Sequence, residues 1–326
     1  MSKRFTIESN RNMYQSNKKI LVTGGAGFIG SALIPELQKH DHEIHVIDNL
    51  SFGDRKLVDI FDVDFYELDI LNQVALNHTI RAINPNWIIH LAAIHFIPYC
   101  NQYPVEASRT NIQGTINVLE SAKSLTNLER IFFASTAAVY PICNDAVSEA
   151  GVLDPIDIYG ISKLAGEHLM NEFHLQTSVP TVIGRFFNAF GPNETNAHVI
   201  PEIQKQVNSG VRCIKLGNIE PKRDFIHTHD MAIAITLLLD KFSSGSDVFN
   251  IGSGTEYSVK DIVTTFSQQL GEELLIEVDP ERIRKVERMH LLADIGKLKS
   301  FINWEPRINL SEGISTLLDI HQLTLK

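Results

Sequence analysis

Tyr159 and Lys163 are spaced so that they can exchange protons with a bound molecule as a pair. Residues four apart lie on one face of a helix, and the pattern of residues 158–176 predicts a helix there. A free tyrosine has a pKa of about 10, but a neighbouring ammonium favours the phenolate and lowers that pKa. The pair therefore suits proton transfer to or from a hydroxyl group. A tyrosine and a lysine at this spacing are also common as a surface pair, so their surroundings decide between the two interpretations.

A glycine-rich turn over residues 24–30 indicates a nucleotide-binding site. It directly follows the apolar run Ile20-Leu21-Val22-Thr23. Gly24 permits a tight turn, Gly27 lets a pyrophosphate approach the backbone, and Gly30 lets the next helix pack closely on the strand. The free N–H groups and the positive dipole end of that helix would hold the phosphates. The alternative is a glycine-rich turn with no ligand.

Two acidic residues lie where they could bind the adenosine half of a dinucleotide. Asp48 ends the second predicted strand, where a carboxylate can accept both ribose hydroxyls and repel a 2′-phosphate, which favours NAD over NADP. Arg55 and Lys56 follow closely and could weaken that preference. Asp69 is either a partner for the adenine amino group or a helix cap before Leu71. With NAD bound, the Tyr159–Lys163 pair would move a proton from a sugar hydroxyl while hydride moves to the nicotinamide.

Thr136 adds a hydroxyl to this predicted site. It follows the fifth predicted strand, in the segment Ser135-Thr136-Ala137-Ala138-Val139-Tyr140. Doubly wound sheets bind ligands at the carboxyl ends of their strands, so Thr136 can share a substrate hydroxyl with Tyr159. The alternative is an ordinary β-rich strand ending.

The elements that must position these residues alternate between strand and helix through the first 185 residues. Strands are predicted over residues 18–23, 43–48, 64–68, 87–91, 130–135 and 181–186. Helices are predicted over residues 27–40, 71–83, 104–125, 158–176, 228–241 and 258–270. Strands separated by helices imply a parallel, doubly wound α/β sheet of the Rossmann type. We expect an extension over residues 1–17, a dinucleotide domain over 18–187 with segments around 225–255 returning to it, and a smaller substrate lobe over 188–326.

Composition excludes several classes of protein. The 326 residues carry 29 Lys and Arg against 39 Asp and Glu, a net charge of −10, which argues against nucleic acid as the partner. The cysteines Cys100, Cys143 and Cys213 lack the spacing of a metal site, so we predict no metal and a reduced, cytoplasmic setting. No run approaches the length of a membrane span, and Met1–Asn17 lacks the apolar core of a secretory signal.

The motifs together resemble the extended short-chain dehydrogenase/reductases of the NAD-dependent epimerase/dehydratase family, nearest to the nucleotide-sugar (UDP-glucose type) 4-epimerases. The resemblance runs from Lys18 to about Leu318. It rests on TGGAGFIG (23–30), DNLS (48–51), HLAA (90–93), STAAVY (135–140), YGISK (159–163), RFFNAFGP (185–192), RDFIH (223–227) and NIGSG (250–254). Relatives of this kind are often homodimers paired through the helices predicted over 104–125 and 158–176, so a homodimer is expected by resemblance.

The resemblance implies a role for each matching residue. Tyr159 would be the catalytic base and acid, Lys163 its partner and Thr136 the hydroxyl that orients the sugar. Asn188, Arg223 and Arg284 would hold the nucleotide diphosphate, although Arg282 competes with Arg284 for the last place. The residues that would contact NAD are Gly24, Gly27, Phe28, Ile29, Gly30, Asp48, Asn49, Asp69, Ile70, Leu91, Ala92, Ala93, Tyr159 and Lys163.

Several positions depart from the family pattern. Ile158 replaces the usual proline before the catalytic tyrosine. Ala137 and Ala138 stand where the 4,6-dehydratases carry an Asp-Glu pair and the UDP-glucuronate decarboxylases carry a glutamate next to the threonine. Alanine cannot perform acid–base chemistry, which argues against both branches. Leu291 stands near the position of a bulky tyrosine that excludes N-acetyl sugars in some 4-epimerases, so the N-acetylhexosamines stay open.

His95 lies in a predicted loop after the fourth strand, close to where the nicotinamide would bind. It could hydrogen-bond a sugar hydroxyl or carboxylate, or act as an additional acid or base. A structural hydrogen bond is the alternative.

The sequence therefore predicts NAD-dependent epimerisation at C4 of a nucleotide sugar, a UDP-hexose, a UDP-hexuronate or a UDP-N-acetylhexosamine, through a 4-keto intermediate. The alternatives are a decarboxylase, dehydratase or reductase acting on a related nucleotide sugar, and a non-catalytic NAD-binding protein.

Overall fold

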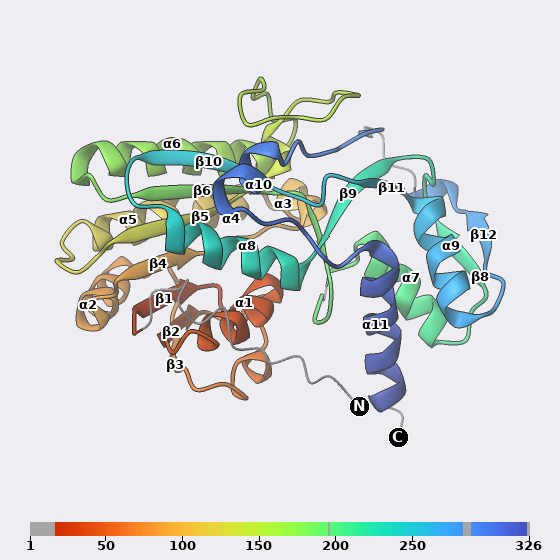
Figure 1. Cartoon of the computed structure of the whole chain (residues 1–326), viewed down its shortest axis with the longest axis horizontal. Coiled ribbons are helices and arrows are strands. Elements are labelled where there is room, and N and C mark those ends of the chain that lie inside the picture. The colour runs from red at the N-terminus through yellow and green to blue at the C-terminus, as the bar shows by residue number, and fades with distance from the viewer. Residues whose placement is uncertain (1–16, 195, 283–287, 325–326) are drawn as a thin grey trace, which may run out of the picture.

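Seven parallel strands form one sheet in the order β10-β6-β5-β4-β1-β2-β3 (Figure 1). The computed structural model describes residues 17–194, 196–282 and 288–324, so nearly all of the extension expected over 1–17 lies outside the described residues. The strands are β1 (Lys19–Thr23), β2 (Glu43–Asp48), β3 (Asp64–Glu67), β4 (Trp87–His90), β5 (Arg130–Thr136), β6 (Thr181–Phe186) and β10 (Ser246–Ile251). The strand order reverses between β1 and β4, which is the point where ligands bind in such sheets. The expected doubly wound fold is confirmed.

Helices cover both faces of this sheet, which explains why its strands are almost continuously apolar. Side chains alternate along β1, so that Ile20 and Val22 join one core cluster and Leu21 joins the other. The first cluster is closed by α1 (Phe28–Gln38), α8 (Thr228–Lys241) and α10 (Gly296–Ile302). The second is closed by α2 (Gln73–Ile83), α5 (Gly114–Ala122) and α6 (Ile158–Thr177).

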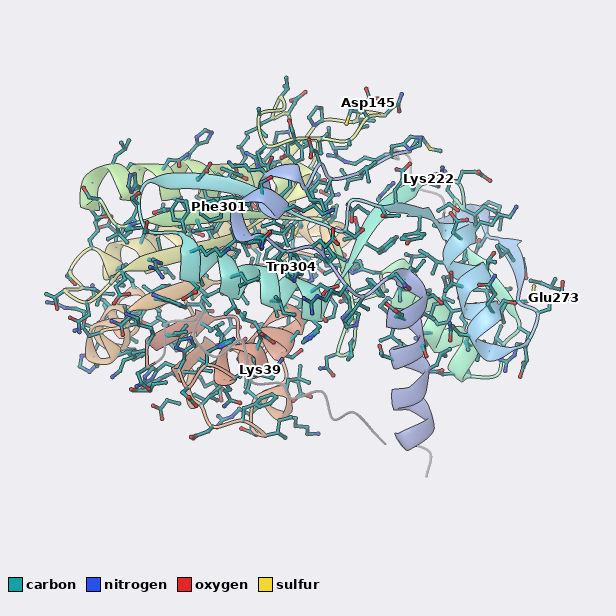
Figure 2. The ribbon with its side chains drawn as sticks, in the orientation of Figure 1. Lys39, Asp145, Lys222, Glu273, Phe301 and Trp304 are labelled. Carbon is teal, nitrogen blue, oxygen red and sulfur yellow. The ribbon has the colours of Figure 1, made fainter. Side chains whose placement is uncertain are left out.

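A smaller lobe lies at the right of Figure 1 and has a core of its own. Three strands form the sheet β11-β9-β7, with β9 starting at Lys222, which is labelled in Figure 2. The strands are β7 (Asn188–Phe190), β8 (Cys213–Leu216), β9 (Lys222–His227), β11 (Glu256–Ser258) and β12 (Leu275–Val278), of which β8 and β12 pair in parallel. The helices of this lobe are α7 (Val199–Asn208), α9 (Val259–Leu270) and α11 (Leu310–Thr324). Between 225 and 255, α8 and β10 pack into the large sheet, whereas β9 belongs to the small one.

The helix expected over 104–125 is present from Pro104 to Ala122, three residues shorter than expected, but it is not a uniform α-helix. That stretch contains α4 (Pro104–Ser108), the π-helical turn η2 (Arg109–Gln113) and α5. The wider turn accompanies Asn111, a buried residue whose amide bonds the Ile94 N–H and carbonyl and the Ser162 hydroxyl. A short helix, α3 (Ile97–Gln102), also replaces part of the loop expected after β4, and Pro98 at its first turn is a residue typical of helix starts.

The other predicted helices have ends within two residues of those observed. Single turns of 3₁₀ helix occur at η1 (Arg55–Leu57), η3 (Ala137–Val139) and η4 (Pro280–Arg282). Within the described part of the chain, no helix is both long and apolar enough to cross a membrane.

Candidate active site

A cavity of about 1160 Å³ lies at the carboxyl ends of the sheet strands and extends to the smaller lobe. Every predicted site residue within the described chain lines it. These are Gly24, Gly27, Phe28, Ile29, Gly30, Asp48, Asn49, Asp69, Ile70, Leu91, Ala92, Ala93, His95, Thr136, Tyr159, Lys163, Asn188 and Arg223. Arg284 lies outside the described residues.

The glycine turn leaves no room for side chains. Gly24 has a φ of +74°, and a Cβ there would come within 2.6 Å of the Ala92 nitrogen. A Cβ on Gly30 would come within 2.3 Å of the Gly25 carbonyl oxygen, so Gly30 packs α1 against the turn and not against the strand as expected. Gly25 makes the approach to the sheet, since its Cβ would meet Val46 at 2.8 Å. The turn is therefore a bare-backbone cradle at the start of α1, which fits a dinucleotide pyrophosphate.

Asp48 is held in place by the same turn. Its two carboxylate oxygens accept hydrogen bonds from the Ala26 N–H (3.0 Å) and the Leu50 N–H (2.9 Å). Burial raises the pKa of this carboxyl, and the two backbone donors oppose that rise. Arg55 is engaged elsewhere, on Asp59 and over the ring of Phe65, 4.1 Å from its centroid.

Asp69 follows β3, and its carboxylate accepts two hydrogen bonds from neighbouring residues. Asp69 accepts from the Leu71 N–H at 2.8 Å and from the Asn49 amide at 3.0 Å. Asp69 therefore closes a turn and does not cap a helix, because α2 begins at Gln73 and its N-cap is Asn72. The helix cap considered as the alternative for Asp69 is wrong, and the Asp69 side chain lines the cavity.

Tyr159, Thr136 and Lys163 line the same cavity, and Tyr159 lies within hydrogen-bond reach of Thr136. Asp157 caps α6 by accepting from the Gly160 N–H (2.8 Å), and this fixes the first turn of the helix, where Tyr159 lies. Burial raises the pKa of Tyr159, and a hydrogen bond with Thr136 partly opposes the rise. Thr136 is itself fixed because its hydroxyl accepts from the Ala138 N–H at 3.1 Å.

Lys163 is 3% exposed, and its Nζ lies 4.8 Å from the centre of the Phe133 ring. Burial lowers the pKa of this lysine to about 7. An ammonium in such a position gains from any negative charge that forms beside it, including a phenolate on Tyr159.

His95 is tied to the loop that follows β7. Its Nε2 lies 3.0 Å from the Asn196 amide nitrogen, so that Nε2 accepts and the proton resides on Nδ1. Burial lowers the pKa of His95, with His198 and Lys163 adding to the effect and Glu194 opposing it. His95 thus has a structural partner and also faces the cavity.

Two arginines besides Arg223 line the cavity. Arg282 forms ion pairs with Glu202 (2.9 Å) and Asp279 (3.4 Å). Arg288 was not predicted as a site residue, and its guanidinium donates to the carbonyl oxygens of Tyr140 (2.8 Å) and Pro141 (3.0 Å). No local sequence signal marks Arg288, because its partners are about 150 residues away along the chain.

Known proteins share this architecture. The sequence profile of the NAD dependent epimerase/dehydratase family matches residues 20–252. A putative UDP-glucose 4-epimerase of Methanocaldococcus jannaschii is 30% identical over 305 residues, covering 92% of this chain and 97% of the relative. The structure of a Thermotoga maritima UDP-glucose 4-epimerase with UDP-glucose superposes with a TM-score of 0.86 at 27% identity, covering 94% of this chain and 99% of that one. A Thermus thermophilus UDP-glucose 4-epimerase in complex with NAD gives a TM-score of 0.85 at 26% identity, covering 93% and 98%.

The family match and the glycine cradle agree on the cofactor, which is NAD. Since the matched segment spans most of the chain and includes most of the residues that line the cavity, the chain belongs to the NAD-dependent epimerase/dehydratase family.

Proposed function

We propose that the chain epimerises a nucleotide-linked sugar at C4, most simply a UDP-hexose, a UDP-hexuronate or a UDP-N-acetylhexosamine. The observation that carries this proposal is the convergence of Tyr159, Lys163 and Thr136 on the cavity that holds the glycine cradle. The similarity to UDP-glucose 4-epimerases supports the same reaction.

The residues of the chain would divide the proton chemistry between them. Thr136 and Tyr159 hydrogen-bond the C4 hydroxyl, and Tyr159 accepts its proton as the carbon is oxidised. Lys163 stabilises the phenolate that initiates this step. NAD supplies a reversible hydride acceptor. The 4-keto sugar then turns in the cavity, and Tyr159 returns the proton as C4 is reduced from the opposite face.

The smaller lobe would anchor the nucleotide while the sugar turns. Asn188 and Arg223 line that side of the cavity, and Arg284 is the third group proposed to bind the diphosphate. Guanidinium groups bind phosphate oxygens strongly, and such remote binding energy lets a loosely held intermediate stay on the enzyme.

Ala137 and Ala138 disfavour the decarboxylase and dehydratase alternatives, because no acid or base follows Thr136 at these positions. A reductase would give a product of changed mass, and a non-catalytic NAD-binding protein would give no product. The test is to incubate the purified protein with UDP-, GDP-, CDP- and dTDP-sugars and analyse products by mass and NMR. Isomers of unchanged mass support the proposal, whereas a product of changed mass, or none, contradicts it.

Tyr159→Phe tests the mechanism with the same assay. Loss of the proton carrier is expected to lower turnover by about 10²- to 10⁴-fold while bound NAD is retained. Tyr66→Phe is the matched control, because the Tyr66 hydroxyl faces His45 away from the cavity. A fully active Tyr159→Phe enzyme would contradict the assignment.

We further propose a cytoplasmic homodimer paired through α6 and the helical segment 104–122, which comprises α4, η2 and α5. Val105 on α4 and Ile161 on α6 are 80% and 49% exposed, and pairing through these helices would cover both. All three cysteines are free thiols, which fits a reducing compartment. Sedimentation velocity should give a dimer for the wild type and a monomer for the Val105→Asp, Ile161→Asp double variant.

A further inference from the structure

Arg288 is a cation in the active-site cavity with no acidic partner among the described residues. Its side chain is half-buried, and the three oxygens that it contacts are all main-chain carbonyls, those of Ala138, Tyr140 and Pro141. Arg282, by contrast, pairs with two carboxylates at the same cavity. Arg288 therefore keeps a net positive charge at the cavity wall.

The hydrogen bonds of Arg288 leave one edge of the guanidinium available. Both Nη1 protons are used, at 2.8 and 3.0 Å, and Nη2 makes one long contact of 3.4 Å to the Ala138 carbonyl. The Nε–H and the second Nη2–H have no partner within the described residues. These two parallel donors form the edge that binds a carboxylate in two-pronged fashion.

Arg288 contacts the segment that follows Thr136 and lines the same cavity as Tyr159. The carbonyl oxygen of Ala138, which Arg288 contacts, would lie 2.5 Å from a Cβ on Gly160, the residue after Tyr159. The N–H of the same Ala138 donates to the hydroxyl of Thr136. Arg288 is thus separated by a single residue, Ala138, from both groups proposed to hold the C4 hydroxyl.

The surroundings favour a negative group on the ligand. Burial lowers the pKa of Arg288, and the charges of Asp157 and Cys143 oppose that change. Asp157 is not within ion-pair distance, and one of its oxygens already accepts from the Gly160 N–H. The adjacent side chains of Ala137 and Ala138 offer no competing polar group. A half-buried guanidinium with two donors left unpaired by the described chain suits a carboxylate that can accept both of them.

We propose that Arg288 recognises a carboxylate on the sugar itself, so that the preferred substrate is a nucleotide-linked hexuronate. In a hexuronate the carboxylate is carried on C5, next to the reacting C4, so it would lie beside the C4 hydroxyl that Tyr159 and Thr136 hold. This inference rests on the proposed function and narrows its substrate class. Since no acid or base follows Thr136, the carboxylate would be bound and kept.

The experiment compares UDP-glucuronate with UDP-glucose on the wild type, Arg288→Gln and Arg288→Lys enzymes. The wild type is expected to prefer the uronate, and Arg288→Gln to lose about 10- to 100-fold in kcat/KM on the uronate, as expected for a hydrogen-bonded charge. Its kcat/KM on UDP-glucose should change several-fold at most. Arg288→Lys keeps the charge but lacks the two-pronged edge. Its kcat/KM on the uronate should therefore lie between those of the wild type and Arg288→Gln.

Binding to the same enzymes provides a readout besides turnover. Calorimetry should show that Arg288→Gln weakens the binding of UDP-glucuronate and leaves the affinity for UDP unchanged. Arg212→Gln is the control, because Arg212 also contacts main-chain carbonyls but pairs with Glu272 outside the cavity. An equal loss for UDP and UDP-glucuronate would assign Arg288 to the diphosphate and overturn the inference. Equal wild-type efficiency on both sugars would also overturn it and leave the epimerase proposal intact, whereas no isomerisation of any sugar would reject that proposal.

Discussion

Arg185 and Glu167 form a buried, two-pronged ion pair directly behind the proposed catalytic residues. Arg185 Nη2 lies 2.7 Å from Glu167 Oε2, and Arg185 Nε lies 2.9 Å from Oε1. The two side chains are 3% and 4% exposed. The hydroxyl of Ser135 also donates to Glu167, one turn along α6 from Lys163. The pair therefore joins β6 to α6, which carries Tyr159 and Lys163, and through Ser135 it also reaches β5, which carries Thr136.

Glu167→Ala should destabilise the protein by about 3–5 kcal/mol, because it leaves the Arg185 guanidinium buried without a counter-charge. Urea denaturation measures this change. Glu272→Ala, which breaks the exposed pair with Arg212, should cost about 0–1 kcal/mol. The Glu167→Leu, Arg185→Met double variant should recover most of the stability, since it removes both charges. A single variant as stable as the wild type would show that the pair is not desolvated.

Gly30→Ala should remove bound NAD from the purified protein. The new Cβ would lie 2.3 Å from the Gly25 carbonyl, so the turn that cradles the pyrophosphate must move. NAD released on denaturation measures occupancy. Gly210→Ala is the control: its φ of +85° makes the change strained by about 1 kcal/mol, but its Cβ meets open space. If Gly30→Ala retained full NAD, the turn would not set the cofactor's position.

Local rules were sufficient to predict six of the seven strands of the large sheet and much of the cavity wall, whereas β10 was expected only as part of the segments around 225–255 that return to it. Thr136 was placed by the rule that ligands meet the carboxyl ends of parallel strands, and Tyr159 and Lys163 by their spacing on one helix face. Their placement in one cavity follows from α6 packing beside β5. Their roles stay predictions.

Tertiary contacts account for what the sequence could not predict. Arg288 reaches Tyr140 across 148 residues, and Asn196 reaches His95 across 101, so neither contact has a local pattern. The π-helical turn at Asn111 depends on partners at Ile94 and Ser162, in other elements. The spacing of the glycine motif does not predict the close approach of Gly25 to the sheet, because its neighbour Val46 lies on β2.

Lys163→Met should make the NAD-free protein more stable at pH 7 while abolishing turnover. Burial lowers the folded-state pKa of Lys163 from 10.5 to about 7, so folding disfavours the ammonium. Between these two pH values the unfolded chain binds more protons than the folded one, and wild-type stability rises with pH. Below pH 7 both states are protonated and the full penalty applies. Methionine removes that penalty and keeps the apolar contact with Phe133.

The gain from Lys163→Met should therefore depend on pH in a defined direction. We expect it to be on the order of 2–4 kcal/mol at pH 7 and to shrink as pH approaches 10.5. Urea denaturation of both proteins at pH 7, 8 and 9.5 measures the trend. Lys123→Met, which affects only an exposed pair with Glu120, should show no such trend. A Lys163→Met protein that is less stable at pH 7, or whose gain is constant with pH, would mean that the lysine is not destabilised by burial. The expected gain would instead show that the proposed site holds its ammonium at the expense of folding, as is common where activity requires a buried charge.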